Sequence, residues 1–409
     1  MALDGEEVIW TNWVGNQQCH PTRIEQAGTE AEIAAAVARA LDEGLGIRTA
    51  GSGHSFTPIV ETPGVLLDTR GLSGVVSVDA EGEQVTALAH TTIAQLGEPL
   101  WNAGLALRNQ GDIDSQALAG AVATSTHGSG RHLGSYSAEL TACRLVDGQG
   151  QLRSFSLADD PEVFPAFQCS VGLLGIMTEL TLSVTKAYHL HEEILFLHAD
   201  AVRERWADLQ RDYRHFSFFW MPTDSSSGLY GFPEAKADHC MVKLYRECPA
   251  PTGAESLPAG QRIDRSYRIY PHVFEPNFHE LEYFLPASAG LEAFDEQRRF
   301  MLANLPDAVY PLEVRFVAAD EAWMSPNYQR DSLVLSVSGK PGTDYWPYLK
   351  ACDERMAAAG GRPHWGKLHF MTAERLAERF PRYGDFSAVR QDLDPKGAFL
   401  NPHLAAMFS

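Results

Sequence analysis

The sequence predicts an α+β protein with two domains. Its 409 residues are too many for one ordinary hydrophobic core and fit about two domains. Segments with the apolar spacing of helices are interspersed with short β-like segments that glycine and proline bound. After about Lys186 the β-like segments become rich in aromatic residues, so we place the domain boundary there.

The first domain begins with clear helix and strand signals. Thr29 and Glu32 have the spacing of a capping box, and apolar residues at helical spacing follow as far as Gly44. A strand at 46–48 then leads into a glycine-rich loop. The other predicted elements are strands at 65–68, 75–78, 84–88, 140–146, 152–157 and 176–184, a helix at 92–102, and a short helix that begins at Asp160-Pro161.

The second domain mixes helices with aromatic-rich strands. Its predicted elements are strands at 216–220, 240–245, 280–285, 312–317 and 332–338, and helices at 291–303 and 344–358. We interpret this part as an α+β domain that carries substrate-binding residues.

Composition and charge exclude several classes of protein. The formal net charge is −20, whereas a surface for nucleic acid or an anionic membrane needs clustered lysine and arginine. The cysteines lack C-x-x-C spacing, the N-terminus has no signal-like pattern, and no apolar run reaches the roughly 18 residues of a membrane-spanning helix. We therefore expect a soluble cytoplasmic protein with reduced thiols and a small-molecule substrate that is neutral or cationic.

A glycine-rich loop from Arg48 to Pro58 follows the first predicted helix and strand. Gly51 and Gly53 lack Cβ atoms, so backbone N–H groups there can approach an anion such as a pyrophosphate. A Rossmann fingerprint needs G-x-G-x-x-G at the start of a helix, and here no third glycine follows before Phe56. This context disfavours a nicotinamide dehydrogenase. By itself the loop also fits an ordinary tight turn with a surface histidine.

Two further segments of small residues, Gly111 to Gly130 and Ser170 to Leu182, look suited to close backbone approach. Together with the first loop they resemble the FAD-binding domain of the vanillyl-alcohol oxidase superfamily. The motifs Trp10-Thr11-Asn12-Trp13, Glu313-Val314-Arg315 and His364-Trp365-Gly366-Lys367 narrow the resemblance to the aldonolactone and alditol oxidase branch. It extends from Trp10 to Asn401.

The resemblance implies a two-domain fold of the vanillyl-alcohol oxidase type. Residues 1–186 would form a discontinuous FAD-binding domain to which 367–409 return, and 187–366 an α+β substrate or cap domain. The residues that it assigns to FAD are His54, Gly51, Ser52, Gly53, Ser55, Gly111, Asp112, Ser115, Gly120, Thr124, Thr126, His127, Gly128, Ile176 and Asn401.

Three of these positions bear directly on the flavin chemistry. His54 matches the histidine that is bonded to the flavin 8α-methyl group, although a histidine that merely lines a non-covalent site is the alternative. Asp112 stands where many relatives have serine, and a carboxylate donates a hydrogen bond only when protonated. Gly111 matches a position where a side chain can block oxygen, so glycine favours an oxidase unless backbone geometry alone requires it.

The resemblance places substrate residues on the second domain. Glu313 and Arg315 alternate along one predicted strand and therefore project to the same face. They would orient a polyhydroxylated substrate together with Asp112, Ser338 and His364. The alternative for Glu313 and Arg315 is an ion pair on a solvated sheet.

Lys367 is the catalytic candidate in the C-terminal segment. Removal of a hydroxyl proton as hydride leaves for the flavin needs nearby positive charge, which Lys367 and Arg315 can supply. Repulsion by Arg315 should also lower the pKa of Lys367 towards general-base use. The alternative is a surface lysine. We predict no metal site, because His364 and His369 have no carboxylate or thiol at ligand spacing.

These features predict a flavoenzyme that oxidises an alcohol group of an aldonolactone or polyol and passes the electrons from FAD to oxygen, which gives hydrogen peroxide. The nearer alternative is a dehydrogenase of the same fold that uses a quinone or cytochrome. The other alternative is a flavin-binding protein without turnover.

Overall fold

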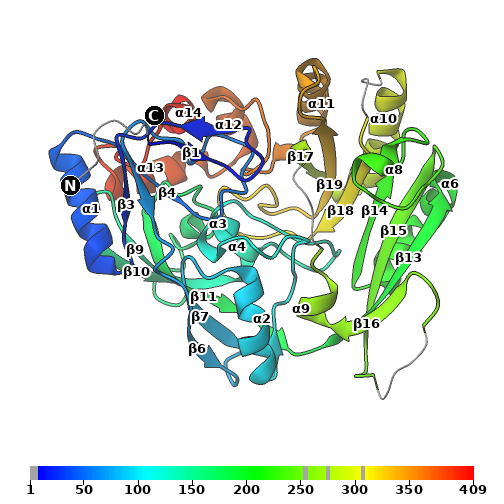
Figure 1. Cartoon of the computed structure of the whole chain (residues 1–409), viewed down its shortest axis with the longest axis horizontal. Coiled ribbons are helices and arrows are strands. Elements are labelled where there is room, and N and C mark those ends of the chain that lie inside the picture. Colours follow the sequence, from blue (N-terminus) through cyan, green and yellow to red (C-terminus); the bar gives the residue numbers. More distant parts are fainter. Residues whose placement is uncertain (1–7, 252–256, 273–276, 305–308) are drawn as a thin grey trace.

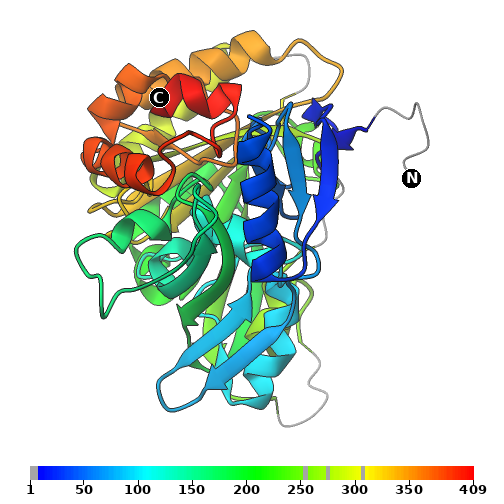
Figure 2. The same ribbon diagram turned by 90° about the vertical axis from the view of Figure 1, so that its left-hand side faces the viewer.

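The chain begins with a parallel sheet and a helix. The computed structural model describes residues 8–251, 257–272, 277–304 and 309–409, so residues 1–7 of the predicted first domain lie outside the described residues. The three strands lie in the order β3 (Arg23–Gln26), β5 (Val65–Asp68) and β4 (Ile47–Ala50). Helix α1 (Glu30–Asp42) lies along this sheet (Figure 2). Its side chains Ile33 and Val37 pack against the strands.

The predicted capping box at the start of α1 is only half present. The Thr29 hydroxyl accepts a hydrogen bond from the Glu32 amide, but the Glu32 carboxylate accepts from the Gly28 amide instead of from Thr29. The complete capping box occurs at Thr92 and Gln95, where α2 (Ile93–Asn102) begins.

An antiparallel five-stranded sheet forms the rest of the N-terminal region. Its strands lie in the order β10 (Leu152–Ser156), β9 (Leu140–Val146), β11 (Ile176–Ser183), β7 (Gln84–Leu88) and β6 (Val75–Asp79). The shorter elements are β1 (Trp10–Thr11), β2 (Gln18–Cys19), β8 (Leu105–Ala106), β12 (Thr185–Lys186), α3 (Leu118–Ala123), α4 (Tyr136–Glu139) and α5 (Pro165–Gln168). The helix predicted from Asp160 begins only at Pro165, because the residues between them form turns.

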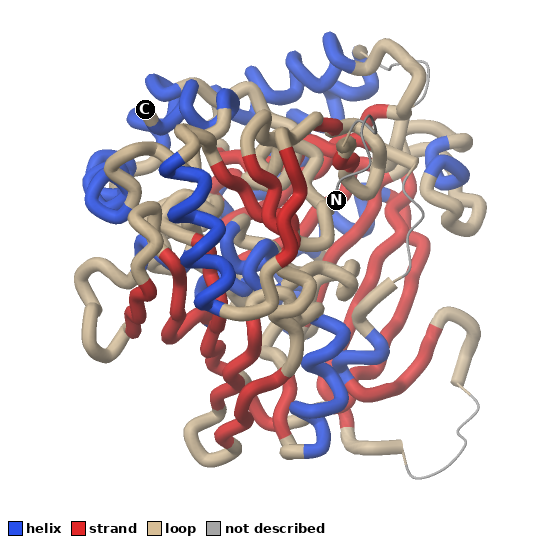
Figure 3. Tube along the Cα trace, turned by 60° about the vertical axis from the view of Figure 1, so that its left-hand side comes forward, coloured by secondary structure: helices blue, strands red, loops and turns tan. Residues whose placement is uncertain are grey.

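The second region is one eight-stranded sheet in which all neighbouring strands are antiparallel. The strands lie in the order β16 (Gln261–Arg265), β13 (His189–His198), β15 (His239–Cys248), β14 (His215–Trp220), β18 (Leu312–Val317), β19 (Ser332–Gly339), β17 (His279–Pro286) and β20 (Arg362–Pro363). Its helices are α6 (Ala199–Glu204), α7 (Trp206–Asp212), α8 (Ser226–Leu229), α9 (Ser266–Ile269), η1 (Ala287–Ala289), α10 (Gly290–Ala303) and α11 (Trp346–Ala358). In Figure 3 the long strands of this sheet run side by side.

The two faces of this sheet differ because side chains alternate along each strand. One face is apolar and includes Leu281, Tyr283, Val314 and Leu335, which join α10 and α11 in a core. The other face carries polar residues in cross-strand register. Glu282 on β17 pairs with Ser336 on β19, and Ser336 pairs with Glu313 on β18.

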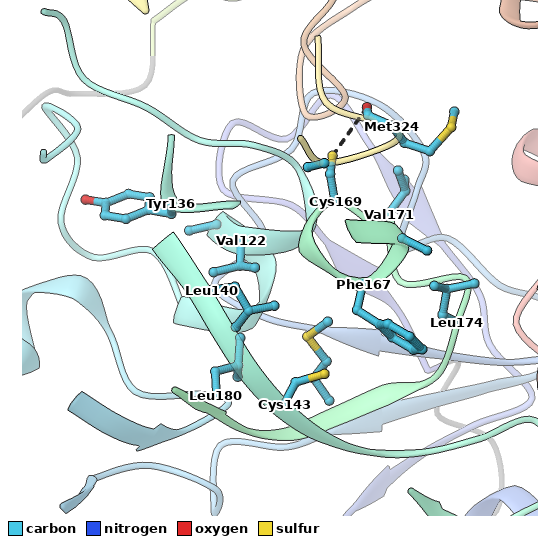
Figure 4. Close-up of a cluster of buried hydrophobic side chains, with 14 of the residues drawn as sticks. Val122, Tyr136, Leu140, Cys143, Phe167, Cys169, Val171, Leu174, Leu180 and Met324 are labelled. Carbon is cyan, nitrogen blue, oxygen red and sulfur yellow. Dashed lines mark hydrogen bonds between the residues drawn. The ribbon is translucent and has the colours of Figure 1, made fainter. Parts of the chain in front are cut away.

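The C-terminal helices return to the N-terminal region (Figure 1). They are α12 (Ala373–Arg379), α13 (Tyr383–Leu393) and α14 (Pro402–Phe408). Leu376, Phe386 and Leu404 share one buried core with Leu140 and Phe167. Figure 4 shows the part of this core where the Cys169 thiol donates to the Met324 carbonyl oxygen. The α+β class that the sequence predicts is confirmed. No described helix is long and apolar enough to cross a membrane.

Candidate functional site

A large cavity lies between the glycine-rich loops of the N-terminal region and the polar face of the eight-stranded sheet. Most of the residues predicted from the sequence meet in its lining. These are Gly51, Ser52, Gly53, His54, Ser55, Gly111, Asp112, Gly120, Thr124, Thr126, His127, Ile176, Glu313, Arg315, His364 and Lys367.

The loop after β4 presents free backbone donors. Gly53 has φ +70°, a conformation that favours glycine, and a Cβ atom on Gly51 would lie 3.3 Å from the Ala117 Cβ. The amides of residues 52–55 donate to no acceptor within the described part of the chain. Such a run of backbone N–H groups can bind the phosphates of a dinucleotide.

Neighbouring segments hold this loop in place. The Trp13 amide donates to the Gly53 carbonyl oxygen at 3.1 Å, and the Asn12 side chain donates to the Ser55 carbonyl oxygen at 2.9 Å. From the C-terminal side, the Phe56 amide donates to the Gly366 carbonyl oxygen at 2.7 Å. The loop is therefore fixed by segments distant in the sequence.

His54 stands on this loop with its ring against the indole of Trp13, at 4.7 Å between ring centroids. Burial, reinforced by the charge of Lys367, lowers the pKa of His54 to about 4. The imidazole is therefore neutral at pH 7. Its Nε2 lies 3.2 Å from the Ser115 hydroxyl, whereas its Nδ1 is buried without a partner among the described residues.

Four predicted residues are not in the cavity lining. The Ser115 hydroxyl lies 3.2 Å from His54 Nε2, and the Ser338 hydroxyl lies 2.7 Å from the Tyr230 hydroxyl. A Cβ atom on Gly128 would collide with the backbone of Gln110, so this glycine permits close packing of two loops. The side chain of Asn401 caps α14 and donates to two backbone carbonyls, so its role is structural.

The sequence interpretation missed several residues of the site. Glu280 and Glu282 on β17 are buried and line the cavity, and the aromatic rings of Phe219, Tyr230 and Phe278 form another part of its wall. The available signal was the pattern Glu280-Leu281-Glu282, which places two carboxylates on one face of an otherwise apolar strand.

Asp112 is part of a buried ion-pair network. Its Oδ1 lies 3.1 Å from the ammonium of Lys243, which the sequence interpretation also missed, and its Oδ2 lies 2.5 Å from the guanidinium of Arg315. Burial opposes the charge of Asp112, but the two cations outweigh it and keep its pKa well below the usual range. Asp112 therefore joins the FAD-side loop to the eight-stranded sheet.

Lys367 forms an ion pair with Glu280 at the edge of the cavity. Burial opposes its positive charge, but the carboxylates of Glu280 and Glu282 outweigh burial and raise the pKa of Lys367. The expected lowering of this pKa by Arg315 is therefore wrong, because the nearby carboxylates outweigh it and Arg315 is itself paired with Asp112 and Glu313. Lys367 therefore keeps its positive charge at neutral pH.

Glu313 is the carboxyl group best suited to accept a proton. It is buried and accepts from Arg315 Nε at 2.6 Å. Burial raises its pKa to about 7; Arg315 opposes this rise, while the nearby carboxylates of Asp112, Glu280 and Glu282 support it. A base with a pKa near the working pH is effective in proton transfer.

His127, Glu282 and His364 place three possible ligand atoms within 4.8 Å of one another. The Gly366 amide donates to His364 Nδ1, and burial lowers the pKa of His364 to about 3. The neutral ring therefore carries its proton on Nε2, which makes that nitrogen a donor and not a metal ligand. Glu282 is also occupied, since it contacts His127 at 3.1 Å and accepts from Ser336 at 2.6 Å.

Comparison with known proteins agrees with this arrangement. Residues 21–156 match a family model described as an FAD binding domain, and residues 239–407 match the D-arabinono-1,4-lactone oxidase model. The chain is 33% identical to L-gulono-1,4-lactone dehydrogenase of Mycobacterium tuberculosis over 97% of this chain and 98% of the relative. It is 31% identical to alditol oxidase of a Streptomyces species over 96% and 97% of the two chains.

Among solved structures, a cholesterol oxidase from B. sterolicum superimposes with a TM-score of 0.82 at 16% identity, over 98% of this chain and 96% of the other. This likeness confirms the two-domain fold predicted from the motifs. The residues of the cavity also fit FAD, since the lining loop carries free amides at residues 52–55 and His54 has a ring nitrogen without a partner among the described residues.

Proposed function

This chain belongs to the family of flavin-dependent sugar-lactone and alditol oxidoreductases, and from that premise we propose that it oxidises a CH–OH group of a neutral sugar lactone or polyol. One observation carries the proposal. Glu313, Arg315 and Lys367 converge from the sheet side on the same cavity that the FAD-side loops line.

The residues have distinct roles in this reaction. FAD, when bound, would supply the hydride acceptor. Glu313 takes the proton of the substrate hydroxyl, because it is the acid with a raised pKa beside the cations. Lys367 and Arg315 stabilise the negative charge that develops on the substrate oxygen and on the reduced cofactor. His364 donates a hydrogen bond from Nε2 to a substrate hydroxyl.

Residues 51–55 would hold the pyrophosphate of FAD, and residues from the 111–128 segment would contact its flavin. The cap residues Phe219, Tyr230 and Phe278 cover the nonpolar side of the substrate. Since the four buried carboxyl groups of Asp112, Glu280, Glu282 and Glu313 outnumber the cations Lys243, Arg315 and Lys367, a neutral substrate fits better than an acid.

We further propose that oxygen is the electron acceptor, although the relatives include a dehydrogenase and an oxidase. Gly111 lines the cavity without a side chain, and a Cβ atom there would meet the His127 carbonyl oxygen at 3.3 Å. Such a contact requires a shift of only a few tenths of an ångström.

We expect a panel of lactones, alditols and simple alcohols to bleach the flavin anaerobically, and air to restore its colour with release of peroxide.

Gly111→Ala should slow reoxidation by oxygen but leave reduction largely intact, because interiors are densely packed and one methyl group can obstruct a narrow path. Stopped-flow absorbance in both half-reactions measures this. Reoxidation by a quinone or cytochrome but not by oxygen would favour the dehydrogenase alternative, and no bleaching would favour a flavin-binding protein without turnover.

We also propose that FAD is bonded covalently to His54. The support is a neutral imidazole with an unpartnered, buried nitrogen in the cavity lining. We expect the yellow colour to remain with the polypeptide after acid precipitation, and His54→Ala to release it into the supernatant. Colour in the supernatant of the unmodified protein would contradict the bond.

A further inference from the structure

The two ring nitrogens of His54 have different surroundings. Nε2 lies 3.2 Å from the Ser115 hydroxyl, and Nδ1 is buried without a partner among the described residues. The Ser52 hydroxyl donates to the Ser115 carbonyl oxygen at 2.7 Å, which ties the two loops together. Ser115 thus engages one ring nitrogen, whereas the other has no partner among the described residues, and His54 itself lines the cavity.

Hydrogen bonding decides which nitrogen carries the proton of the neutral ring. A proton on Nε2 can be donated to Ser115, which leaves a free electron pair on Nδ1. The opposite tautomer would bury an N–H group without an acceptor, at a cost of about 1–3 kcal/mol. Ser115 therefore favours the tautomer in which Nδ1 is the nucleophile.

We propose that Ser115 is a positioning residue for flavin attachment: its hydroxyl holds the proton of His54 on Nε2, so that Nδ1 forms the bond to the cofactor. This inference rests on the proposed His54 linkage and adds the residue that prepares it.

Formation of the bond between His54 and the flavin is a two-electron oxidation. A bond forms between His54 Nδ1 and the flavin 8α carbon, and one C–H bond of that methyl group breaks. Two protons leave, one from the carbon and one from His54 Nε2. The two electrons pass through the flavin to oxygen, which with two protons becomes hydrogen peroxide.

Ser115 suits the departure of the second proton. Its hydroxyl can accept from Nε2–H before the bond forms and donate to bare Nε2 afterwards, because a hydroxyl is both donor and acceptor. Ser115 is exposed, so the released proton has a route to solvent.

Attachment can be measured without turnover. The protein is isolated after expression with limiting flavin, mixed with FAD and oxygen, and precipitated with acid at intervals. The flavin fluorescence of the denatured polypeptide then gives the rate of attachment. We expect Ser115→Ala to slow attachment at least tenfold while FAD still binds, and Ser115→Thr to restore it because threonine keeps the hydroxyl. Ser73→Ala is the control, since that exposed serine bonds Gln95 outside the cavity lining.

The experiment tests the His54 linkage and the role of Ser115 separately. If the unmodified protein never retains flavin after acid, the His54 linkage itself is wrong. If it does and Ser115→Ala attaches flavin at the same rate, only the role of Ser115 is wrong. A flavin peptide from the unmodified protein bonded through Nε2 would also overturn the tautomer assignment.

Discussion

Replacing Lys367 with methionine should slow anaerobic flavin reduction about a hundredfold, or ~2.7 kcal/mol in the barrier, as does removal of one preorganised donor to a developing oxyanion. Lys367 keeps its positive charge because Glu280 and Glu282 raise its pKa. Methionine keeps most of the apolar volume but none of the charge. Stopped-flow absorbance with a good substrate measures the effect.

Loss of the cation also leaves Glu280 buried without its partner, which can destabilise the fold. This structural effect must be separated from a direct effect on flavin reduction. The double variant Lys367→Met with Glu280→Leu removes both charges and should recover stability but not the reduction rate. Lys340→Met, at an exposed lysine directly after β19, is the control. Normal reduction in the Lys367→Met variant would exclude a catalytic role for this residue.

Replacing Glu313 with glutamine should have the largest effect, about a thousandfold on flavin reduction, because general acid–base groups contribute roughly a hundredfold to ten-thousandfold. Glutamine keeps the size of the side chain and can still accept from Arg315, but it cannot take a proton at neutral pH. Unchanged FAD absorbance and thermal unfolding would show that the fold survives.

The pH dependence gives a second readout for Glu313. Its pKa is raised to about 7, and a base works only when it is ionised. The reduction rate of the unmodified protein should therefore rise with pH and level off above about 7. The glutamine variant should lose this rise. A rate that falls through pH 7, or the same rise in the variant, would assign proton removal to another group.

The ion-pair partners of Asp112 could not be predicted from the family resemblance. Its departure from serine put a substrate contact in doubt. The structure places its carboxylate between Lys243 and Arg315, with one cation on each oxygen, so it orients an active-site cation. Lys243 lies 131 residues away in the chain, and no local pattern could connect the two.

The sequence by itself determined those features of the protein that depend on residues close together in the chain. Glycine spacing indicated the loops that approach a cofactor closely, period-two alternation put Glu313 and Arg315 on one face, and ordered motifs identified the family and its flavin. The α+β class, α2, α10, the hairpin from β9 to β10 and the strands β11, β17, β18 and β19 followed from the same local rules.

The tertiary structure alone decided the protonation states and partners in the site. The pKa of Lys367 was expected to fall through repulsion by Arg315, but Glu280 raises it from a strand 87 residues away. Likewise, the free nitrogen of His54 depends on Ser115, which lies 61 residues along the chain. Charges and hydrogen bonds act over a few ångströms in space, whereas sequence patterns record only spacing along the chain, so pKa values and tautomers emerge only when distant segments pack together.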